Sequence, residues 1–195
     1  MKKIIWPPGT HLAPVPAVLV GTGGHGFPDN LLTVAWTGIV CSDPPMLSVS
    51  VRPERFSYRA LRETGEFTVN IPTARMASDT DWCGVVSGRD HDKFAERHLT
   101  PLKASKIEAP LVGECPLSLE CRTRQVLELG AHHLFLADIL AVQVSEEFLD
   151  PSGRLDLEKD GLLAYVHGHY FGLGRCIGHF GFSVRRKKGP RTRRS

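Results

Sequence analysis

The chain has 195 residues, of which 42% are hydrophobic and 23% charged, values that suit one globular domain with a sizeable core. Seven of its 24 Lys and Arg residues lie in 183–195, which has no acidic residue, so the remainder has 17 basic and 21 acidic residues and a net charge of −4. These values exclude disorder across the chain, and no apolar run approaches the roughly 18 residues of a transmembrane helix.

The first part of the chain is expected to form short strands separated by turns. Residues 15–21 are an apolar run ending in glycine, and residues 22–29 are rich in Gly, Pro and Asp, a pattern typical of a strand and a turn. Residues 32–40 are rich in β-branched and aromatic side chains, and the prolines at 44–45 end that segment. Residues 46–52 alternate between apolar and polar side chains, which predicts a strand with one solvated face.

The middle of the chain combines a strand with two helical segments. Residues 56–63 have helical spacing, and Gly65 lies where a helix typically ends. Residues 66–71 have the pattern of a strand and precede a proline. Residues 77–99 are expected to be mostly helical, with a break at 87–88, where serine precedes glycine.

Strands dominate the second half. Alternation predicts a strand over 117–127, and the β-branched and apolar residues of 133–144 predict another. A loop at 151–153 precedes short strand-like segments around 163–165 and 169–171. Because strands and helices do not alternate regularly, we expect a mainly β fold with short helices, an antiparallel barrel that leaves few strand edges exposed.

One domain accounts for most of the chain. We see no internal repeat or linker and expect a domain over residues 1–182, followed by a solvated basic tail over 183–195. The tail has no aromatic residues between its basic ones, so nucleic-acid binding is not expected.

Cysteine usage and the N-terminus predict a cytoplasmic protein. The five cysteines are an odd number without a Cys-x-x-Cys pair, which favours reduced thiols over a disulfide framework or a metal site. Cys115 and Cys121, with five residues between them, are expected on neighbouring positions of the strands of a sheet. Pro7 and Pro8 interrupt the N-terminal segment before an apolar stretch begins, so no secretory signal is expected.

A glycine-rich motif invites a dinucleotide-binding interpretation that the surrounding residues argue against. Residues 21–26, Gly-Thr-Gly-Gly-His-Gly, match G-x-G-x-x-G after a predicted strand. In a dinucleotide-binding fold the motif opens a helix, whereas here Phe27 and Pro28 lead into a β-rich segment. Asp43, beside two prolines in a turn, does not suit the ribose-binding acid. We therefore predict a glycine-rich hairpin turn.

Ten segments of the chain, taken together, form a recognisable series. They are residues 30–38, 41–53, 56–57, 65–72, 87–88, 92–94, 114–116, 120–121, 129–132 and 170–174. Each segment is weakly specific alone, and the specificity lies in their order. By these segments, from about Pro14 to Phe182, the chain resembles the flavin reductase-like family, whose members have an FMN-binding split β-barrel, and within it the flavoredoxin branch.

The resemblance implies a set of FMN contacts. A barrel wall of small and β-branched residues leaves backbone N–H groups beside a flat surface, which suits the isoalloxazine ring. Arg52 and Ser57, the latter near the start of a predicted helix, suit the terminal phosphate. Lys93 is expected to assist at the phosphate, Ser50 belongs to the wall, and Trp36 is a candidate for it. The contacts implied by the resemblance are Asn30, Thr33, Ala35, Ser48, Val49, Arg52 and Ser57.

Structural alternatives stay open for several of these residues. Asn30 also suits a left-handed turn position, and Trp36 suits a place in the core. Thr33, Ala35 and Val49 suit plain core packing, and Arg52 suits a surface charge. For Arg52, its position at the end of an alternating strand beside Ser57 favours the anion site.

Two residues are candidates for a catalytic role, or for contact with the nicotinamide, beside the flavin. In the family, a histidine near the position of His132 lies beside the nicotinamide or substrate face of the flavin. The alternatives are a solvated turn residue, or an assignment that shifts to His133. Tyr170 is expected to cover the flavin or nicotinamide, or to pack the end of the barrel.

The resemblance implies a flavoprotein oxidoreductase that uses FMN, accepts hydride from NAD(P)H and passes electrons to a flavin, an iron species or a protein. One alternative is a flavoredoxin-type electron carrier that NAD(P)H does not reduce directly, and another is a split barrel that binds haem or no cofactor. The flavin family also implies a homodimer with a redox protein or free flavin as electron acceptor. The sequence contains no obvious acid–base pair, which suits hydride transfer.

Overall fold

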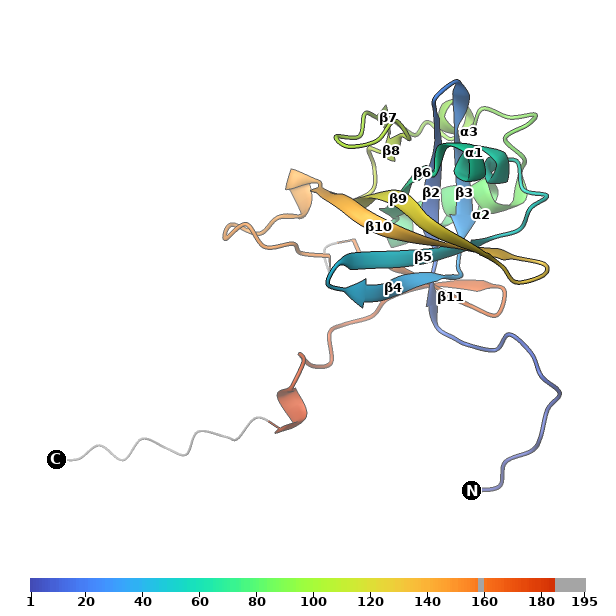
Figure 1. Cartoon of the computed structure of the whole chain (residues 1–195). Coiled ribbons are helices and arrows are strands. Elements are labelled where there is room, and N and C mark those ends of the chain that lie inside the picture. The colour runs from blue at the N-terminus through green and yellow to red at the C-terminus, as the bar shows by residue number, and fades with distance from the viewer. Residues whose placement is uncertain (158–159, 185–195) are drawn as a thin grey trace.

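The fold is built on a seven-stranded antiparallel sheet (Figure 1). The computed structural model describes residues 1–157 and 160–184. In spatial order the strands are β3 (Phe27–Val34), β2 (Val18–Gly24), β6 (Glu66–Ile71), β9 (Leu117–Glu128), β10 (His133–Val144), β5 (Pro45–Val51) and β4 (Thr37–Ser42). Every pairing between these strands is antiparallel.

Smaller elements complete the fold. One small sheet contains β1 (Val15–Pro16), β11 (Leu163–Val166) and β12 (His169–Gly172), and another contains β7 (Pro101–Leu102) and β8 (Leu111–Val112). The α-helices are α1 (Ser57–Thr64), α2 (Ala77–Val85) and α3 (Lys93–Glu96). Single 3₁₀ turns occur at η1 (Ala74–Met76), η2 (Glu146–Phe148) and η3 (Phe182–Val184).

The chain itself brings the two edges of the large sheet together. β3 and β4 lie at opposite ends of the strand order, yet only Ala35 and Trp36 connect them. The sheet must therefore curl until its ends meet at this link. There the Ser50 N–H donates to the Trp36 carbonyl oxygen over 2.9 Å, which extends the β4–β5 pairing by one residue. The result is the split β-barrel that the sequence predicted.

Alternation along β5 separates the core from the outer side of the barrel. Leu47, Val49 and Val51 are buried in the main core, together with Phe67 of β6 and Phe135 of β10. Burial of such large side chains is the main favourable contribution to folding. The polar residues between them on β5 therefore face the opposite side, where the candidate site lies.

A second core explains why residues 15–21 are apolar without alternation. Leu19 and Leu31, on β2 and β3, pack against Met76, Cys83 and Phe94 from the helical segments. Because β2 is covered on both faces, successive side chains are all buried, and its pattern is continuous rather than alternating.

Most predicted elements are confirmed. The strands predicted over 46–52, 66–71, 117–127 and 133–144 correspond to β5, β6, β9 and β10. The predicted helix over 56–63 is α1, and Gly65 ends it in the left-handed region with φ 67°.

Three predictions need correction. The turn predicted over 22–29 contains only two residues, because β2 extends to Gly24 and β3 begins at Phe27. The single segment over 32–40 is divided by the link between β3 and β4. The helical segment over 77–99 is shorter than predicted, although its break around 87–88 is confirmed, because α2 ends at Val85 and α3 has four residues.

The glycine-rich motif forms the β2–β3 hairpin, as predicted, and not a nucleotide loop. His25 has φ 52° and Gly26 has φ 89°, so both turn residues adopt the left-handed conformations that a tight hairpin requires. No helix follows the motif, since Phe27 begins β3.

The cysteines are unpaired, as predicted. All five are free thiols. Cys121 lies on β9, but Cys115 lies in the loop before it and belongs to the second core, so the two do not occupy neighbouring strand positions. Within residues 1–157 and 160–184, no group of three or more His, Cys, Asp or Glu side chains could hold a metal ion.

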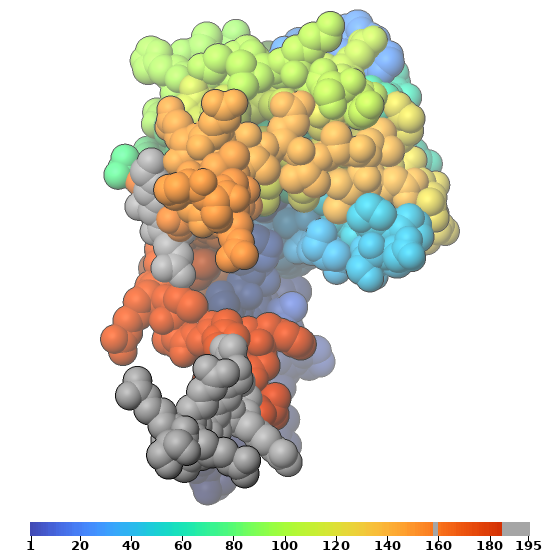
Figure 2. Space-filling model, turned by 90° about the vertical axis from the view of Figure 1, so that its left-hand side faces the viewer, coloured from blue at the N-terminus to red at the C-terminus, as the bar shows by residue number. Residues whose placement is uncertain are grey.

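Both terminal segments leave the barrel at the same end (Figures 1 and 2). Residues 1–14 and 173–184 project beyond β4 and β11, with many apolar side chains exposed. Of the predicted tail over 183–195, only 183 and 184 fall within the described residues, as part of η3. Among the helices in the described part of the chain, none has the length and hydropathy to cross a membrane.

Candidate functional site

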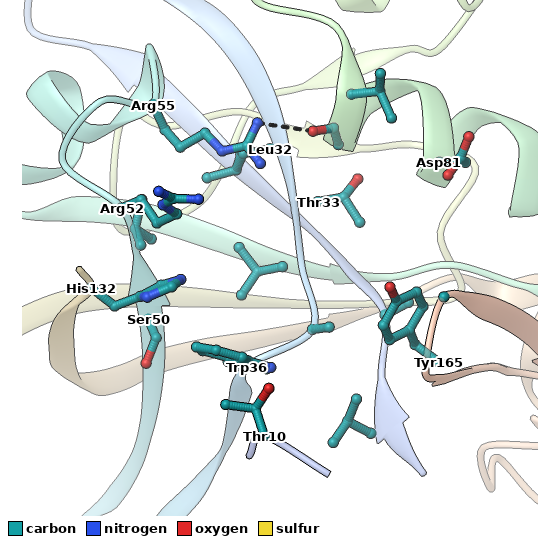
Figure 3. A pocket seen from close by; sticks show the side chains of 18 of the residues that line it. Thr10, Leu32, Thr33, Trp36, Ser50, Arg52, Arg55, Asp81, His132 and Tyr165 are labelled. Carbon is teal, nitrogen blue, oxygen red and sulfur yellow. Dashed lines mark hydrogen bonds between the residues drawn. The ribbon is translucent and has the colours of Figure 1, made fainter. Parts of the chain in front are cut away.

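The largest part of the site is a cavity of about 730 Å³ on the outer side of the β3–β4 link. This volume lies within the range of roughly 300–1,000 Å³ that is usual for cofactor sites. Segments distant in sequence form its walls: the end of β3, the end of β5, α2, the β9–β10 turn and the small sheet of β11 and β12 (Figure 3). Seven predicted site residues line it: Thr33, Ala35, Trp36, Ser50, Arg52, His132 and Tyr170.

A smaller hollow of about 290 Å³ adjoins this cavity, because Leu32, Arg52, Arg55 and Val85 line both. It contains the predicted residues Asn30, Ser57 and Lys93. We call it the phosphate hollow, after the group predicted to bind there.

The floor of the phosphate hollow is a buried hydrogen-bonding pair. The Asn30 amide donates to the Ser57 hydroxyl oxygen over 2.7 Å, and both residues are buried. Asn30 belongs to β3 and is therefore not the turn residue that the sequence left as an alternative. A Cβ atom at Gly88 would lie 2.1 Å from the Asn30 amide oxygen, so the backbone at 88 closes directly over this side chain.

Lys93 is a buried cation at the same place. Its ammonium donates to the carbonyl oxygens of Leu31 and Cys83, each over 2.7 Å. An ammonium has three donors, so these bonds leave one N–H for another acceptor. Burial lowers the pKa of Lys93 to about 8, which leaves it mostly charged at neutral pH.

Positive charge dominates the hollow. Arg52, Arg55 and Lys93 line it, and Glu54 is its one carboxylate in the described chain. Glu54 accepts from Arg52 over 2.7 Å, and both side chains are about half exposed, so solvent screens this ion pair. Arg55 donates to the Gly84 carbonyl oxygen over 3.1 Å (Figure 3). Three cations against one carboxylate make the hollow suitable for a phosphate dianion.

An aromatic pair forms one wall of the main cavity. The rings of Trp36 and His132 lie 4.5 Å apart between centroids and are tilted by 39° (Figure 3). Burial and the neighbouring charge of Arg52 lower the pKa of His132, so its imidazole is neutral at pH 7. Trp36 is therefore part of the cavity wall rather than of the core.

The opposite end of the main cavity carries hydroxyl and carboxylate groups. Tyr170 lies close to Asp81 of α2 in the wall of the cavity, and its ring lies 5.4 Å from that of Tyr165 between centroids. Burial and the negative charge of Asp81 raise the pKa of Tyr170 to about 12, so the phenol stays protonated. Between the two ends, the Thr33 hydroxyl donates to the Thr80 carbonyl oxygen.

Two predicted residues lie outside these cavities. Ser48 lines a shallower hollow of about 420 Å³ that shares Ala35, Trp36 and Ser50 with the main cavity. Val49 has no exposed surface and belongs to the main core, so its side chain has the packing role that the sequence left as an alternative.

Sequence reasoning missed Arg55, Asp81, Tyr165 and Gly84. A second arginine between the end of β5 and α1 was an available signal for Arg55. The others had no local signal, because only the packing of α2 and of the β11–β12 hairpin brings them to the cavity.

Comparison with known proteins agrees with this geometry. Residues 10–174 match the family described as flavin reductase like domain. The fold is similar to the flavoredoxin of Desulfovibrio vulgaris (Miyazaki F), with a TM-score of 0.86 and 33% identity over 95% of this chain and 100% of that chain. A flavoredoxin from Methanosarcina acetivorans has a TM-score of 0.84 and 30% identity at the same coverage. An NADH-dependent FMN reductase of Streptomyces nodosus subsp. asukaensis is 30% identical over 66% of this chain and 69% of its own length.

Proposed function

The chain belongs to the flavin reductase-like family, and on this premise we propose that it binds FMN and is an oxidoreductase that accepts hydride from NAD(P)H. One observation carries the proposal. A cationic hollow with a buried hydrogen-bonding floor adjoins a larger cavity walled by aromatic rings, the order of features that a flavin with a terminal phosphate requires.

Each part of the site has a role in this proposal. The Asn30–Ser57 pair, Lys93 and Arg52 bind the phosphate, and Arg55 adds positive charge beside it. The wall of Thr33, Ala35, Trp36, Ser48 and Ser50 holds the ring, with the backbone of Val49 on the same strand. FMN, when bound, supplies two-electron and one-electron transfer chemistry, and the protein supplies position and electrostatics.

The nicotinamide is proposed to dock at the His132 side of the main cavity. A neutral imidazole both donates and accepts hydrogen bonds, so His132 suits the carboxamide of a nicotinamide without transferring a proton. Tyr170 and Asp81 supply further polar groups at the far end. The electron acceptor is proposed to be a free flavin or a redox protein.

The rival function is a flavin electron carrier that NAD(P)H does not reduce. The similarity to two flavoredoxins favours it, whereas the similarity to an NADH-dependent FMN reductase favours the enzyme. Anaerobic reduction by NADH or NADPH separates the two functions. In the enzyme, the flavin bleaches after addition of the nucleotide; in the carrier, it bleaches only with dithionite.

His132→Ala tests the proposed docking face. The variant should slow anaerobic reduction by NAD(P)H about five- to 150-fold, the effect of losing about 1–3 kcal/mol of contacts. Its FMN affinity and its reduction by dithionite should stay unchanged. His91→Ala is the matched control, since His91 is exposed and pairs with Glu96 outside the cavities. An H132A variant that matches the unmodified protein would contradict this docking face.

The proposal includes a homodimer and a cytoplasmic location. The exposed apolar side chains of the two terminal segments support a homodimer, because apolar surface of this kind is usually covered. The unpaired thiols support the location.

A further inference from the structure

A second cavity, of about 920 Å³, has no part in the proposed function. It lies between the β2–β3 hairpin and α1. The second cavity and the phosphate hollow adjoin, because Asn30, Arg55 and Ser57 line both. A group held in the second cavity would therefore lie next to the phosphate of a bound flavin.

The walls of the second cavity combine aromatic and cationic side chains. Phe27 comes from the hairpin and Phe56 from the start of α1. The Arg59 guanidinium lies 5.6 Å above the Phe27 ring and is paired with Glu63 over 2.7 Å. Aromatic faces of this kind stack with nucleic-acid bases.

Two arginines in the cavity wall have no carboxylate partner within the described chain. Arg55 donates only to the Gly84 carbonyl oxygen, and the exposed Arg89 guanidinium has no ion pair. Arginine pairs with phosphate through parallel N–H donors, and its charge does not titrate at neutral pH.

A buried hydroxyl in the same wall also lacks a partner. Thr22 is 1% exposed, and its hydroxyl oxygen makes no hydrogen bond within the described residues. Buried polar groups in folded proteins are almost always satisfied, and Thr22 is one of the residues that line this cavity.

We infer that the second cavity binds an adenosine phosphate group. FAD and NAD(P)H share this group, and FMN lacks it. Phe27 and Phe56 provide faces for the adenine, while Arg55 and Arg89 provide donors for a phosphate adjoining the phosphate hollow. The position next to the flavin phosphate suits the second phosphate of FAD, so the inference relies on the proposed flavin site for its geometry.

Binding experiments with two variants and one control test the inference. Arg89→Ala removes a phosphate donor, and Phe27→Leu removes an aromatic face while keeping an apolar side chain. Arg62→Ala is the matched control, since Arg62 is on α1, pairs with Glu128 and lines no part of the cavity. FMN and FAD are titrated into apoprotein by fluorescence, ADP is titrated into FMN-loaded protein by calorimetry, and KM for NADPH is measured in parallel.

We expect ADP to bind the unmodified protein. Arg89→Ala and Phe27→Leu should each weaken ADP binding about tenfold and change FMN affinity less than twofold. If FAD affinity falls with ADP affinity, the adenosine phosphate belongs to the flavin. If KM for NADPH rises about tenfold and FAD affinity is unchanged, the adenosine phosphate that binds in the second cavity belongs to the nicotinamide nucleotide. Absence of ADP binding, or ADP binding that neither variant changes, would overturn the inference. Because ADP binding can also be measured without flavin, this result is separate from a failure to bind FMN.

Discussion

At the scale of single residues, the positive charge of the phosphate hollow should distinguish FMN from riboflavin. Arg52 is half exposed and already paired with Glu54, so its net effect on folding is small. Arg52→Ala should weaken FMN about tenfold to a hundredfold, because a charge-assisted hydrogen bond contributes roughly 1.5–3 kcal/mol. Riboflavin, which lacks the phosphate, should bind equally well to both proteins in fluorescence titrations.

A matched control for this variant lies on β9. Arg124 has a similar exposure and pairs with Asp138 over 2.8 Å, so Arg124→Ala removes an equivalent surface ion pair away from the hollow. FMN affinity that changes equally in both variants would show that the effect is general electrostatics. A lowered melting temperature with unchanged FMN affinity would assign Arg52 a structural role.

Lys93 should make FMN affinity dependent on pH. Burial lowers its pKa to about 8 in the free protein, and a bound phosphate dianion raises it again, so binding is coupled to proton uptake. FMN affinity should therefore fall as pH rises through 8 and be roughly tenfold weaker at pH 9 than at pH 7. Titrations of FMN and riboflavin across this range measure the effect. A riboflavin curve with the same slope would assign the titration to another group.

The same pKa predicts the pH dependence of stability in the protein without flavin. The pKa of Lys93 is lower in the folded state than its ordinary value of 10.5 in the unfolded chain. Between pH 8 and pH 10.5 the unfolded state binds more protons, so the Lys93 contribution to the free energy of unfolding should rise with pH. Lys93→Met should remove this contribution in urea titrations at several pH values.

At the scale of elements, the end of α1 determines how the helix joins β6. Gly65 has φ 67°, its N–H donates to the Leu61 carbonyl oxygen, and its own carbonyl oxygen accepts from Thr123 on β9. A Cβ atom there would meet only the Thr123 Cβ at 3.9 Å, so space does not limit substitution. Gly65→Ala should destabilise the protein by about 1–2 kcal/mol, the cost of the left-handed conformation.

Asparagine provides the matched comparison at this position, because it tolerates the left-handed region better than alanine. Gly65→Asn should recover a large part of the loss in thermal or urea unfolding. Equal losses in the two variants would show that contacts of the side chain, rather than the backbone conformation, determine the cost.

At the scale of the whole molecule, the exposed apolar side chains of the terminal segments support the proposed homodimer. Ile5 and Phe180 are fully exposed, and Trp6 and Ile177 are largely so. The terminal segments that contain them lie at one end of the barrel (Figures 1 and 2). A chain that ends at residue 184 should remain dimeric, whereas a chain that ends at residue 174 loses the apolar residues after β12 and should dissociate more readily. Light scattering across a dilution series measures both.

This comparison also tests the basic tail. Flavin binding should survive deletion of 185–195, because none of these residues is among the proposed phosphate contacts. Loss of flavin or of the dimer in the chain ending at 184 would show that the tail is not simply solvated. Dimers of equal stability in both truncated chains would move the interface away from the C-terminal segment.

Local patterns predicted most of the elements. Alternation identified β5 and β9, because a strand with one buried face must alternate, and β-branched and apolar residues identified β10. The position of Gly65 identified the end of α1, because few other residues tolerate a positive φ. The residues around 21–26 were sufficient to reject a nucleotide loop, since no helix follows them. These features depend on neighbours along the chain, which the sequence displays directly.

Tertiary structure decided the composition of the site. Asn30 and Ser57 are 27 residues apart, and Lys93 is 62 residues from its partner Leu31, yet curling of the sheet and packing of α2 and α3 place them in one hollow. The same packing brings Asp81 and Tyr165 to the main cavity and places the Val49 side chain in the core. The sequence by itself determined the strands, the hairpin and the ends of helices, because short-range sterics and periodicity control them. Only the folded chain decided which polar residues meet and which cavities adjoin, because those contacts depend on how distant elements pack.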